Sequence, residues 1–356
     1  MATISAVRCR PLVNGRLKQL LVDIETTAGD IGTGETWWGI APPKGAEPLD
    51  AAIRPMQAVV EALLAPRCLG ENADDIEALW FKLADWAARY GDGGIVMMAL
   101  AGIDLALWDL KARRLGIPAV QLLGGRAHDR LPVYASLPPF RSIEAVVREC
   151  RRAQAAGFCA FKLHEVDVAI VRGTRKALGA DAVIMIDVNG HFDTIEGIAF
   201  GKAIADCDIY WYEEPVHPVR NHDAISRVAS AQPIPLAAGE NEYSLEDFSR
   251  LLSRDAIRWL QPEITKIGGL TPARKISALA EVHNVALAPH NFRNGPALYS
   301  SIHWGFSSPA TRWLELPWLP EGQGFPCGAA LPHVTDGTIG LPEGAGFGLT
   351  VCGRLL

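Results

Sequence analysis

The stretch Tyr210-Trp211-Tyr212-Glu213-Glu214-Pro215 decides how this chain can fold. An apolar run over 209–212 ends in two adjacent carboxylates and is stopped by a proline, which is typical of a buried parallel strand that carries charge to its C-terminal end. Two other segments have the same form, since one run ends in Asp187 and another in Glu240. Oxygen-only ligands at the ends of successive strands predict a hard-cation site, suited to Mg²⁺ more than to Zn²⁺.

The composition of the 356-residue chain favours a large globular core and argues against several classes of protein. The hydrophobic share of 49% is enough for such a core, and the length allows two or three domains. A net charge of -6 without a basic run argues against nucleic-acid binding, and no apolar window is long enough for a membrane span. The first ten residues lack the pattern of an export signal, and the seven cysteines form no CxxC pair. We therefore expect a cytoplasmic protein with reduced thiols.

The first 125 residues predict an α+β domain. Residues 1–30 alternate as an antiparallel hairpin does. The glycine-rich segment 28–40 predicts a flexible loop that carries Trp37 and Trp38. This loop is either a lid that keeps water from an active site or a surface loop with tucked-in rings. Helical spacing follows over 50–64, 74–90 and 95–115, and the last of these is nearly all apolar, as expected of a buried helix between domains.

From Leu131 onward the pattern changes to short β runs that alternate with amphipathic helices. Eight strands with seven intervening helices predict an α/β barrel of parallel strands. The predicted domains are 1–125 for the N-terminal domain, 126–325 for the barrel and 326–356 for a tail that returns to the N-terminal domain. The predicted strands are 131–136, 158–163, 182–187, 209–213, 234–239, 257–261, 285–290 and 313–316, and the predicted helices are 142–156, 168–178, 194–205, 221–231, 244–252, 271–283 and 296–304.

Seven consecutive predicted strands end in a titratable side chain. Because the C-terminal ends of barrel strands face one mouth, these side chains should meet there. A role as a helix cap or a core ion explains one or two of them but not the whole set. In chain order they are Lys162 with His164, Asp187 followed by Asn189, Glu213, Glu240, Glu263, His290 and Glu315.

These strand ends resemble the mandelate racemase branch of the enolase superfamily over nearly the whole chain. Any one of the motifs would be weak, but together they are highly specific. The matching stretches are Lys162-Leu163-His164, Ile186-Asp187-Val188-Asn189, Trp211-Tyr212-Glu213-Glu214-Pro215, Ala238-Gly239-Glu240-Asn241, the run from Gln261 to Gly269, Pro289-His290-Asn291-Phe292 and Trp313-Leu314-Glu315.

The resemblance implies a modified TIM barrel with an N-terminal α+β capping domain. It also implies one Mg²⁺ per subunit, held by Asp187, Glu213 and Glu240. It also implies removal of the proton α to a substrate carboxylate, which gives an enediolate that the metal, Lys162 and Glu315 stabilise. His290 is expected to be the base and Glu263 to orient its ring. Glu214 is expected to lie behind the metal ligands.

The chain departs from the family pattern at two positions. Glu263 stands where the family usually has Asp, and His164 stands where it often has Lys. His164 could therefore act as an acid or base on the opposite face of the substrate. The muconate-lactonizing branch has a catalytic lysine at the register of Glu263, whereas Lys266 lies three residues later, so Lys266 is interpreted as structural.

Among the reactions of this family, the resemblance favours dehydration of an acid sugar to a 2-keto-3-deoxy acid. The alternatives are a racemase or epimerase, a cycloisomerase, and a catalytically inactive scaffold, although a scaffold is expected to have lost a ligand, the base or Glu315. The predicted substrate contacts are Trp38, Asn189, Asn291 and Arg293, with a surface salt bridge as the alternative for Arg293. The resemblance further suggests a homo-oligomer between dimer and octamer, and the sequence does not name the acid.

Overall fold

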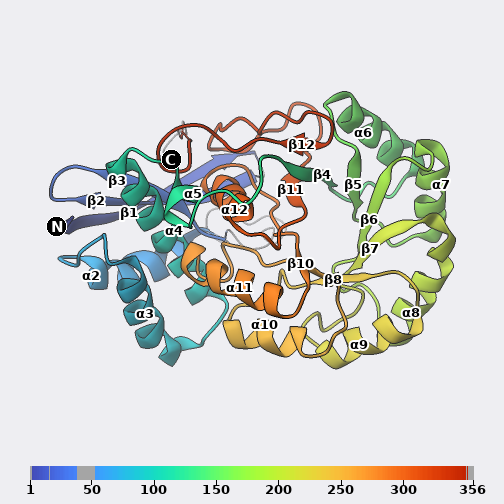
Figure 1. Ribbon diagram of the computed structural model, residues 1–356, viewed down its shortest axis with the longest axis horizontal. Coiled ribbons are helices and arrows are strands. Elements are labelled where there is room, and N and C mark those ends of the chain that lie inside the picture. Colours follow the sequence, from blue (N-terminus) through green and yellow to red (C-terminus); the bar gives the residue numbers. More distant parts are fainter. Residues whose placement is uncertain (1, 16, 38–52, 350, 352–356) are drawn as a thin grey trace.

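Two sheets organise the computed structural model, which describes residues 2–15, 17–37, 53–349 and 351 (Figure 1). A three-stranded antiparallel sheet forms the N-terminal part, and eight parallel strands form a barrel beside it. This arrangement confirms the predicted α/β barrel with an α+β capping domain. The N-terminal elements are β1 (Ile4–Asn14), β2 (Leu17–Thr26), β3 (Ile31–Glu35), α1 (Arg54–Ala58), a π-helical segment (Val59–Leu64), α2 (Ala65–Cys68), α3 (Ile76–Ala87), a 3-10 turn (Ala88–Tyr90), α4 (Ile95–Leu115) and α5 (Ala119–Leu122).

The barrel strands are hydrogen-bonded in the order β10-β9-β8-β7-β6-β5-β4-β11. A parallel bridge between Leu287 and Thr311 joins the two ends of this path. The strands are β4 (Leu131–Leu137), β5 (Ala160–Leu163), β6 (Val183–Asp187), β7 (Ile209–Glu213), β8 (Leu236–Ala238), β9 (Trp259–Leu260), β10 (Ala286–Leu287) and β11 (Leu314–Pro317), and β12 (Thr338–Ile339) pairs antiparallel with β4.

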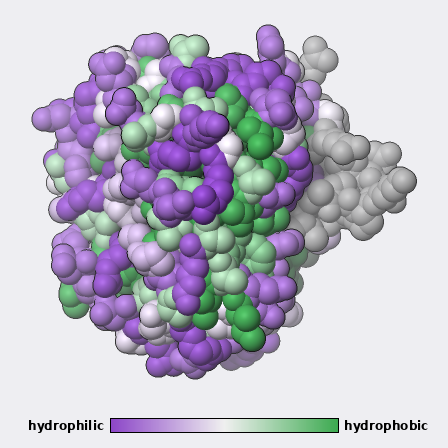
Figure 2. Space-filling model, turned by 90° about the vertical axis from the view of Figure 1, so that its right-hand side faces the viewer, coloured by the Kyte–Doolittle hydropathy of each residue, from purple (hydrophilic) through white to green (hydrophobic). Residues whose placement is uncertain are grey.

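Seven helices cover the outside of the barrel, one after each of the first seven strands (Figure 1). Several begin at side chains that cap the free N–H groups of the first turn, and Asp193 and Ser244 form complete capping boxes. Hydrophilic and hydrophobic residues are interspersed on the outer face shown in Figure 2. The helices are α6 (Ile143–Ala155), α7 (Val168–Leu178), α8 (Thr194–Ala203), α9 (His222–Ala231), α10 (Leu245–Leu252), α11 (Leu270–Val282) and α12 (Pro296–Ser307).

The segment predicted as a flexible glycine-rich loop over 28–40 is partly a strand, so that prediction was wrong for β3. The glycines of β3 serve close packing, because a Cβ on Gly34 would lie 2.1 Å from the carbonyl oxygen of Gly102 in α4. A Cβ on Gly32 would lie 2.2 Å from the carbonyl oxygen of Ala106. The first helix also differs in extent from the predicted 50–64, since it is described from Arg54 and continues to Cys68, and residues 50–52 lie outside the described part of the chain.

The C-terminal segment returns to the capping domain. The backbone N–H of Cys327 donates to Oε1 of Gln19 on β2 over 2.8 Å, and Phe325 packs in a cluster with Leu12 and Leu21. Further on, the N–H of Phe347 donates to Asp109 of α4. The tail therefore closes the capping domain after the barrel is complete.

Helix α4 joins the cap to the barrel through a buried aspartate. Asp104 accepts hydrogen bonds from the N–H and the hydroxyl of Thr271, at 3.0 and 2.6 Å, and thereby caps the N-terminus of α11. The residue that precedes α11, Gly269, has no side chain to do so. Burial raises the pKa of Asp104 to about 7 in spite of these hydrogen bonds. No described helix, α4 included, is long and apolar enough to cross a membrane.

We expect Asp104→Ala to lower the free energy of unfolding by about 2–4 kcal/mol, because it leaves buried donors of α11 without an acceptor. Urea unfolding followed by circular dichroism measures this loss. Asp85→Ala on the exposed side of α3 is the matched control and should change stability by less than about 0.5 kcal/mol. Equal effects of the two substitutions would contradict the capping role of Asp104.

His303 on α12 should make stability depend on pH. It is fully buried, its Nδ1 accepts a hydrogen bond from the N–H of Val120, and burial lowers its pKa to about 4. Neutral His303 therefore contributes fully to the free energy of unfolding above about pH 6.5, the pKa of a histidine in the unfolded chain. This contribution is lost as the pH falls towards 4. Between pH 7 and pH 5 the free energy of unfolding should fall by about 2 kcal/mol because of His303. In urea titrations at several pH values, His303→Gln should remove this part of the pH dependence. An unchanged slope would show that His303 does not titrate in this way.

Candidate active site

A layer of barrel-filling side chains lies directly beneath the candidate site. Tyr134, Ala160, Met185, Trp211, Ala237 and Ala288 form one buried cluster with Trp259 and Trp313 packed against it. Side chains on one face of a strand recur every second residue, so the next inward positions after Ala160, Met185 and Trp211 are Lys162, Asp187 and Glu213. The alternation that fills the barrel thus also places charge at its mouth, where catalytic residues of such barrels lie.

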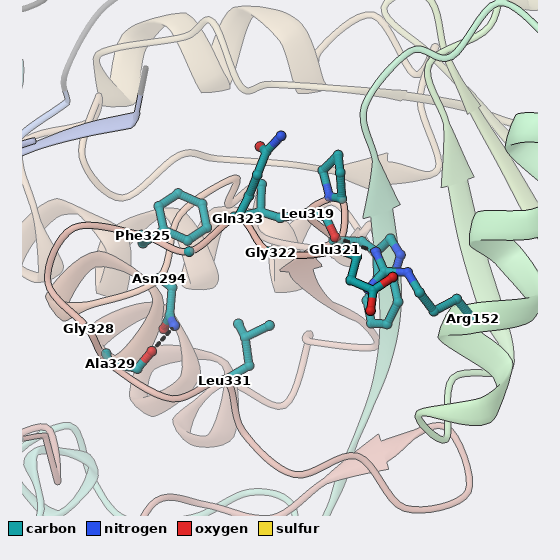
Figure 3. Close-up of a pocket in the computed structure, with 13 residues that line it drawn as sticks. Arg152, Asn294, Leu319, Glu321, Gly322, Gln323, Phe325, Gly328, Ala329 and Leu331 are labelled. Atoms are coloured by element: carbon teal, nitrogen blue, oxygen red, sulfur yellow. Dashed lines mark hydrogen bonds between the residues drawn. The ribbon is translucent and has the colours of Figure 1, made fainter. Parts of the chain in front are cut away.

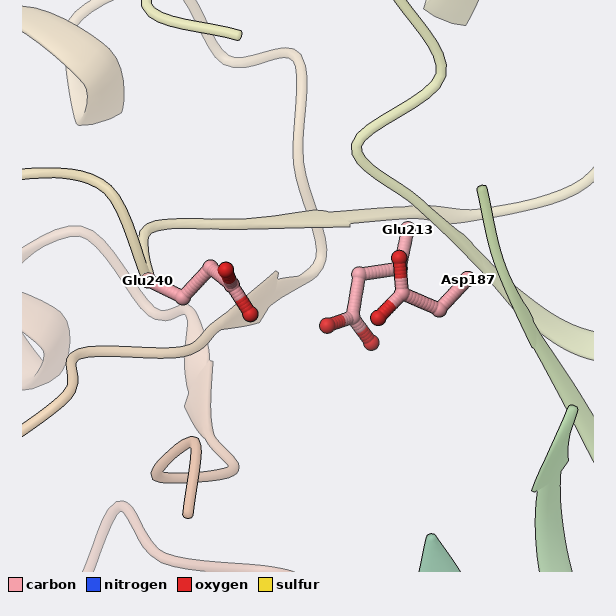
Figure 4. Close-up of side chains that lie close together, drawn as sticks. All are labelled: Asp187, Glu213 and Glu240. Atoms are coloured by element: carbon pink, nitrogen blue, oxygen red, sulfur yellow. The ribbon is translucent and has the colours of Figure 1, made fainter. Parts of the chain in front are cut away.

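Three carboxylates converge at this mouth, as Figure 4 shows. One oxygen each of Asp187, Glu213 and Glu240 lies within 4.8 Å of the others, and the three residues are at most 8% exposed. Oδ2 of Asp187 and Oε2 of Glu240 are buried and accept no hydrogen bond of normal geometry. A set of buried carboxylate oxygens that converge in this way fits a hard divalent cation. Burial and the charge of Asp187 raise the pKa of Glu213, as expected where carboxylates crowd together.

Glu240 reaches this cluster because the backbone turns at Gly239. Strand β8 ends at Ala238, and Gly239 has a φ of 130°, a conformation that side chains rarely adopt. A Cβ at Gly239 would also lie 3.1 Å from the backbone nitrogen of Gln261. The glycine therefore breaks the simple alternation of β8 and lets the following carboxylate turn inward.

Lys162 supplies positive charge at the centre of these acids. Its Nζ lies 2.9 Å from Oε1 of Glu213, 3.0 Å from Oε1 of Glu315 and 3.3 Å from Oδ2 of Asp187. Burial opposes the charge of Lys162, but these carboxylates raise its pKa well above the usual range. Glu315 also accepts hydrogen bonds from the hydroxyl of Tyr134 and from the N–H of Asn291. Lys162 therefore holds one fully buried positive charge among three carboxylates.

His290 and Glu263 form a buried dyad on the other side of the metal-ligand candidates. Nδ1 of His290 lies 2.8 Å from Oε2 of Glu263, whose other oxygen accepts from the N–H and hydroxyl of Thr265. Burial would raise the pKa of Glu263, but the hydrogen bond from His290 and the charge of Arg293 lower it to about 2. An ionised Glu263 fixes Nδ1 of His290 as the donor, so Nε2, which lies 2.9 Å from Glu240, faces the cavity. Glu263, whose side chain is longer than that of the aspartate usual at this position in the family, therefore still reaches His290.

His164 approaches the site from β5. Its Nδ1 lies 2.5 Å from the carbonyl oxygen of Leu137, and its Nε2 lies 3.1 Å from Oδ2 of Asp187. The carbonyl contact makes Nδ1 the donor and directs Nε2 towards the metal-ligand candidates. His164 and His290 thus present ring nitrogens to one cavity from two different strands.

A cavity of about 200 Å³ lies over these groups. Asn189, predicted to contact substrate, lies in its wall, whereas Trp38 lies outside the described residues. Asn291 and Arg293 are almost fully buried and do not line the cavity, so the alternative of a surface salt bridge for Arg293 was wrong. The side-chain amide of Asn291 instead donates to the carbonyl of Arg293. The lining residues are Trp37, Pro138, Pro139, His164, Asn189, Glu240, His290 and Phe292.

Trp37 in this wall and Lys266 and Glu214 behind it were not predicted to contact substrate. Trp37 was noted only as part of the glycine-rich segment, and its ring lies 6.4 Å from that of His290. Lys266, interpreted as structural, lies 2.9 Å from Oδ1 of Asn241 and 3.6 Å from Oε1 of Glu240. Glu214 lies behind the ligand candidates, where Asn241 donates to it over 2.8 Å. Lys266 and Glu214 therefore both form a hydrogen bond with the side-chain amide of Asn241, which lies beside Glu240.

A larger cavity of about 460 Å³ lies elsewhere, beside the segment that follows β11 (Figure 3). Arg152 of α6, Asn294 and residues 318–331 form its wall. The amide of Asn294 donates to the carbonyl of Ala329 there. The lining contains none of the converging carboxylates or histidines, so the smaller cavity at the barrel mouth is the candidate active site.

The chain belongs to the mandelate racemase and muconate lactonizing enzyme family of the enolase superfamily. Residues 145–354 match the family model for the enolase C-terminal domain-like fold. Residues 13–124 match the model for the mandelate racemase / muconate lactonizing enzyme N-terminal domain. The two matches cover most of the barrel and most of the capping domain described above.

Several known proteins are similar to this chain over most of its length. A D-galactarolactone cycloisomerase of Agrobacterium fabrum is 33% identical over 298 residues, which are 81% of this chain and 75% of the relative. A D-galactonate dehydratase of Verminephrobacter eiseniae is 33% identical over 303 residues, with the same two shares.

Solved structures show the same fold. The 3,6-anhydro-D-galactonate cycloisomerase from Zobellia galactanivorans has a TM-score of 0.86 and 28% identity, covering 98% of this chain and 97% of that one. A racemase from Streptomyces coelicolor A3(2) with bound magnesium has a TM-score of 0.84 and 27% identity, covering 98% and 97%.

We expect Mg²⁺ to raise the melting temperature of the protein, because a divalent cation offsets the repulsion among three buried carboxylates. Glu240→Gln should weaken Mg²⁺ affinity, measured by calorimetric titration, by at least about tenfold because one charged ligand is lost. Glu246→Gln on the exposed face of α10 is the control and should leave affinity unchanged. Equal affinities of the two variants would remove Glu240 from the metal site.

Proposed function

We propose that this protein removes the proton α to the carboxylate of a sugar acid and eliminates the β-oxygen, giving a 2-keto-3-deoxy acid. The observation that carries the proposal is the His290–Glu263 dyad, held at 2.8 Å beside the carboxylate triad, with Nε2 of His290 at 2.9 Å from Glu240 and with Lys162 in contact with Glu213. The names of the similar dehydratase and cycloisomerases support a sugar acid as the substrate class.

The proposed first step transfers the α-proton to Nε2 of His290. Glu263 accepts from Nδ1, and its charge stabilises the imidazolium that forms. The electrons of the C–H bond pass into the enediolate of the substrate carboxylate. Lys162 places its ammonium charge beside the developing oxyanion, and Glu315 lies 3.0 Å from that ammonium. In a water-poor pocket such preorganised charge lowers the barrier more than it would in solution.

Asp187, Glu213 and Glu240 are proposed to hold Mg²⁺. Their buried, converging oxygens fit that ion, and a similar racemase structure contains magnesium. When bound, the cation supplies Lewis-acid stabilisation of negative charge on a substrate carboxylate oxygen.

The second step breaks the bond between the β-carbon and its oxygen. The leaving oxygen takes a proton, and among the described cavity residues His164 and protonated His290 are the two that can donate it. A free hydroxyl leaves as water, whereas a ring oxygen stays attached and the ring opens. The enol product then takes a proton at C3 and becomes the ketone. Dehydration and cycloisomerisation therefore share the same groups, and the position of the β-oxygen in the substrate separates them.

A racemase or epimerase is the second candidate, and one observation favours it. His164 lines the cavity after β5, whereas His290 lines it after β10, so a second acid or base is available to a planar intermediate. In that reaction His164 would return a proton to the α-carbon and no bond to oxygen would break. The product distinguishes the two reactions, because only elimination gives a 2-keto acid.

We expect His290→Asn to lower kcat for formation of a 2-keto product from sugar acids by at least about 100-fold, because the base is lost. Glu263→Gln should lower kcat by about 10–100-fold and shift the pH profile, since the ring of His290 loses its ionised partner. Semicarbazide derivatisation of the product over a panel of aldonates, aldarates and lactones measures both variants with Mg²⁺ present. Unchanged kcat in His290→Asn would exclude His290 as the base.

A further inference from the structure

Trp37 stands between the cavity and two buried cations. Its ring lies 3.8 Å from the guanidinium carbon of Arg293 and 4.3 Å from Nζ of Lys266. Arg293 is 0% exposed and Lys266 is 4% exposed, and neither lines the cavity, whereas Trp37 does. The indole therefore covers positive charge that would otherwise lie next to a bound ligand.

Both cations already have acidic neighbours within the protein. Nζ of Lys266 lies 3.6 Å from Oε1 of Glu240 and donates to Asn241. Burial lowers the pKa of Arg293, whereas the charges of Glu263 and Glu35 raise it. These contacts, together with stacking on an aromatic face, hold both cations behind the ring.

The other described residues of the cavity wall provide no cation that could take the place of Arg293 and Lys266 beside a second carboxylate. His164, His290 and Glu240 belong to the reacting end of the cavity, where one substrate carboxylate is bound. The remaining lining residues besides Trp37 are Pro138, Pro139, Phe292 and Asn189, and none of them carries a charge. A second carboxylate would lose water against proline and aromatic surface without gaining a cation, which is costly. The negative π face of an indole also repels an anion.

Resting on the proposed function, we infer that Trp37 restricts the substrate to sugar acids with a single carboxylate, namely aldonates and their cyclic forms, and rejects aldarates. The C–H face of such an acid can pack on the apolar wall, and its hydroxyl groups can reach Asn189. Trp37 is thus a specificity-determining residue that acts by covering Arg293 and Lys266.

The test compares kcat/KM for pairs of acids that differ only in oxidation of the terminal carbon, an aldonate and the aldarate of the same configuration. Configurational isomers are tested with Mg²⁺ until a substrate is found. The wild type should prefer the aldonate by at least about 100-fold. Trp37→Ala uncovers both cations and should shrink this preference at least about tenfold, by raising kcat/KM for the aldarate as well as lowering it for the aldonate.

Two matched variants keep the test specific. Trp37→Phe keeps an aromatic ring over the cations and should keep the preference. Phe292→Ala removes aromatic wall without uncovering Arg293 or Lys266, so it should lower kcat/KM for both acids and leave their ratio within about threefold. An equal preference in wild type and Trp37→Ala, or a wild type that turns over both acids alike, would overturn the inference while the proposed function stands. Absence of turnover of every acid would instead contradict the proposed function, and this inference with it.

Discussion

The crowding of four carboxylates around one lysine at the barrel mouth is the constraint on which the rest of this structure depends. Asp187, Glu213 and Glu315 contact Lys162, and Glu240 completes the metal-ligand triad, all of them buried. Isolated buried charges are too costly to persist, so the cluster needs balancing cations. Lys162 supplies one, and a divalent ion in the triad would offset the excess that remains. Lys162 and such an ion are then the positive charges that would stabilise negative charge developing on a substrate.

The capping domain matters because it places one aromatic side chain over this mouth. Strand β3 packs on α4 with no room for side chains at Gly32 and Gly34, and α4 is tied to the barrel helix α11 through Asp104. Trp37 lies two residues after the end of this strand, so the packing of the cap determines its position over Arg293 and Lys266. In the proposed function the barrel supplies the reacting groups, and the cap supplies Trp37, the residue that we infer to select the substrate.

Much of the barrel and of its polar end could be predicted from the sequence, because both follow from local periodicity. Alternation along β5, β6 and β7 fixes which residues point inward, and the titratable residues at successive strand ends then share one mouth. Glu240 also lies there, although only the turn at Gly239 brings it inward.

The residues that sequence reasoning misplaced depend on tertiary packing. Glycines in β3 predicted flexibility, but they permit contact with a helix that lies some 70 residues later in the chain. The polar residues after His290 were expected in the cavity, yet Arg293 turns behind Trp37 and Asn291 bonds to its own loop. No local pattern distinguishes a cation that faces substrate from one that is covered by an aromatic ring.

The central claim is that His290 takes a proton from the α-carbon of a sugar acid. Proton NMR of the wild-type protein with Mg²⁺ and candidate acids in D₂O tests it most directly. The account predicts that the α-proton signal of a substrate disappears, with deuterium in its place or in a 2-keto-3-deoxy product, and that removal of the metal stops the loss. A substrate that is converted while its α-proton signal persists unchanged in substrate and product would contradict it.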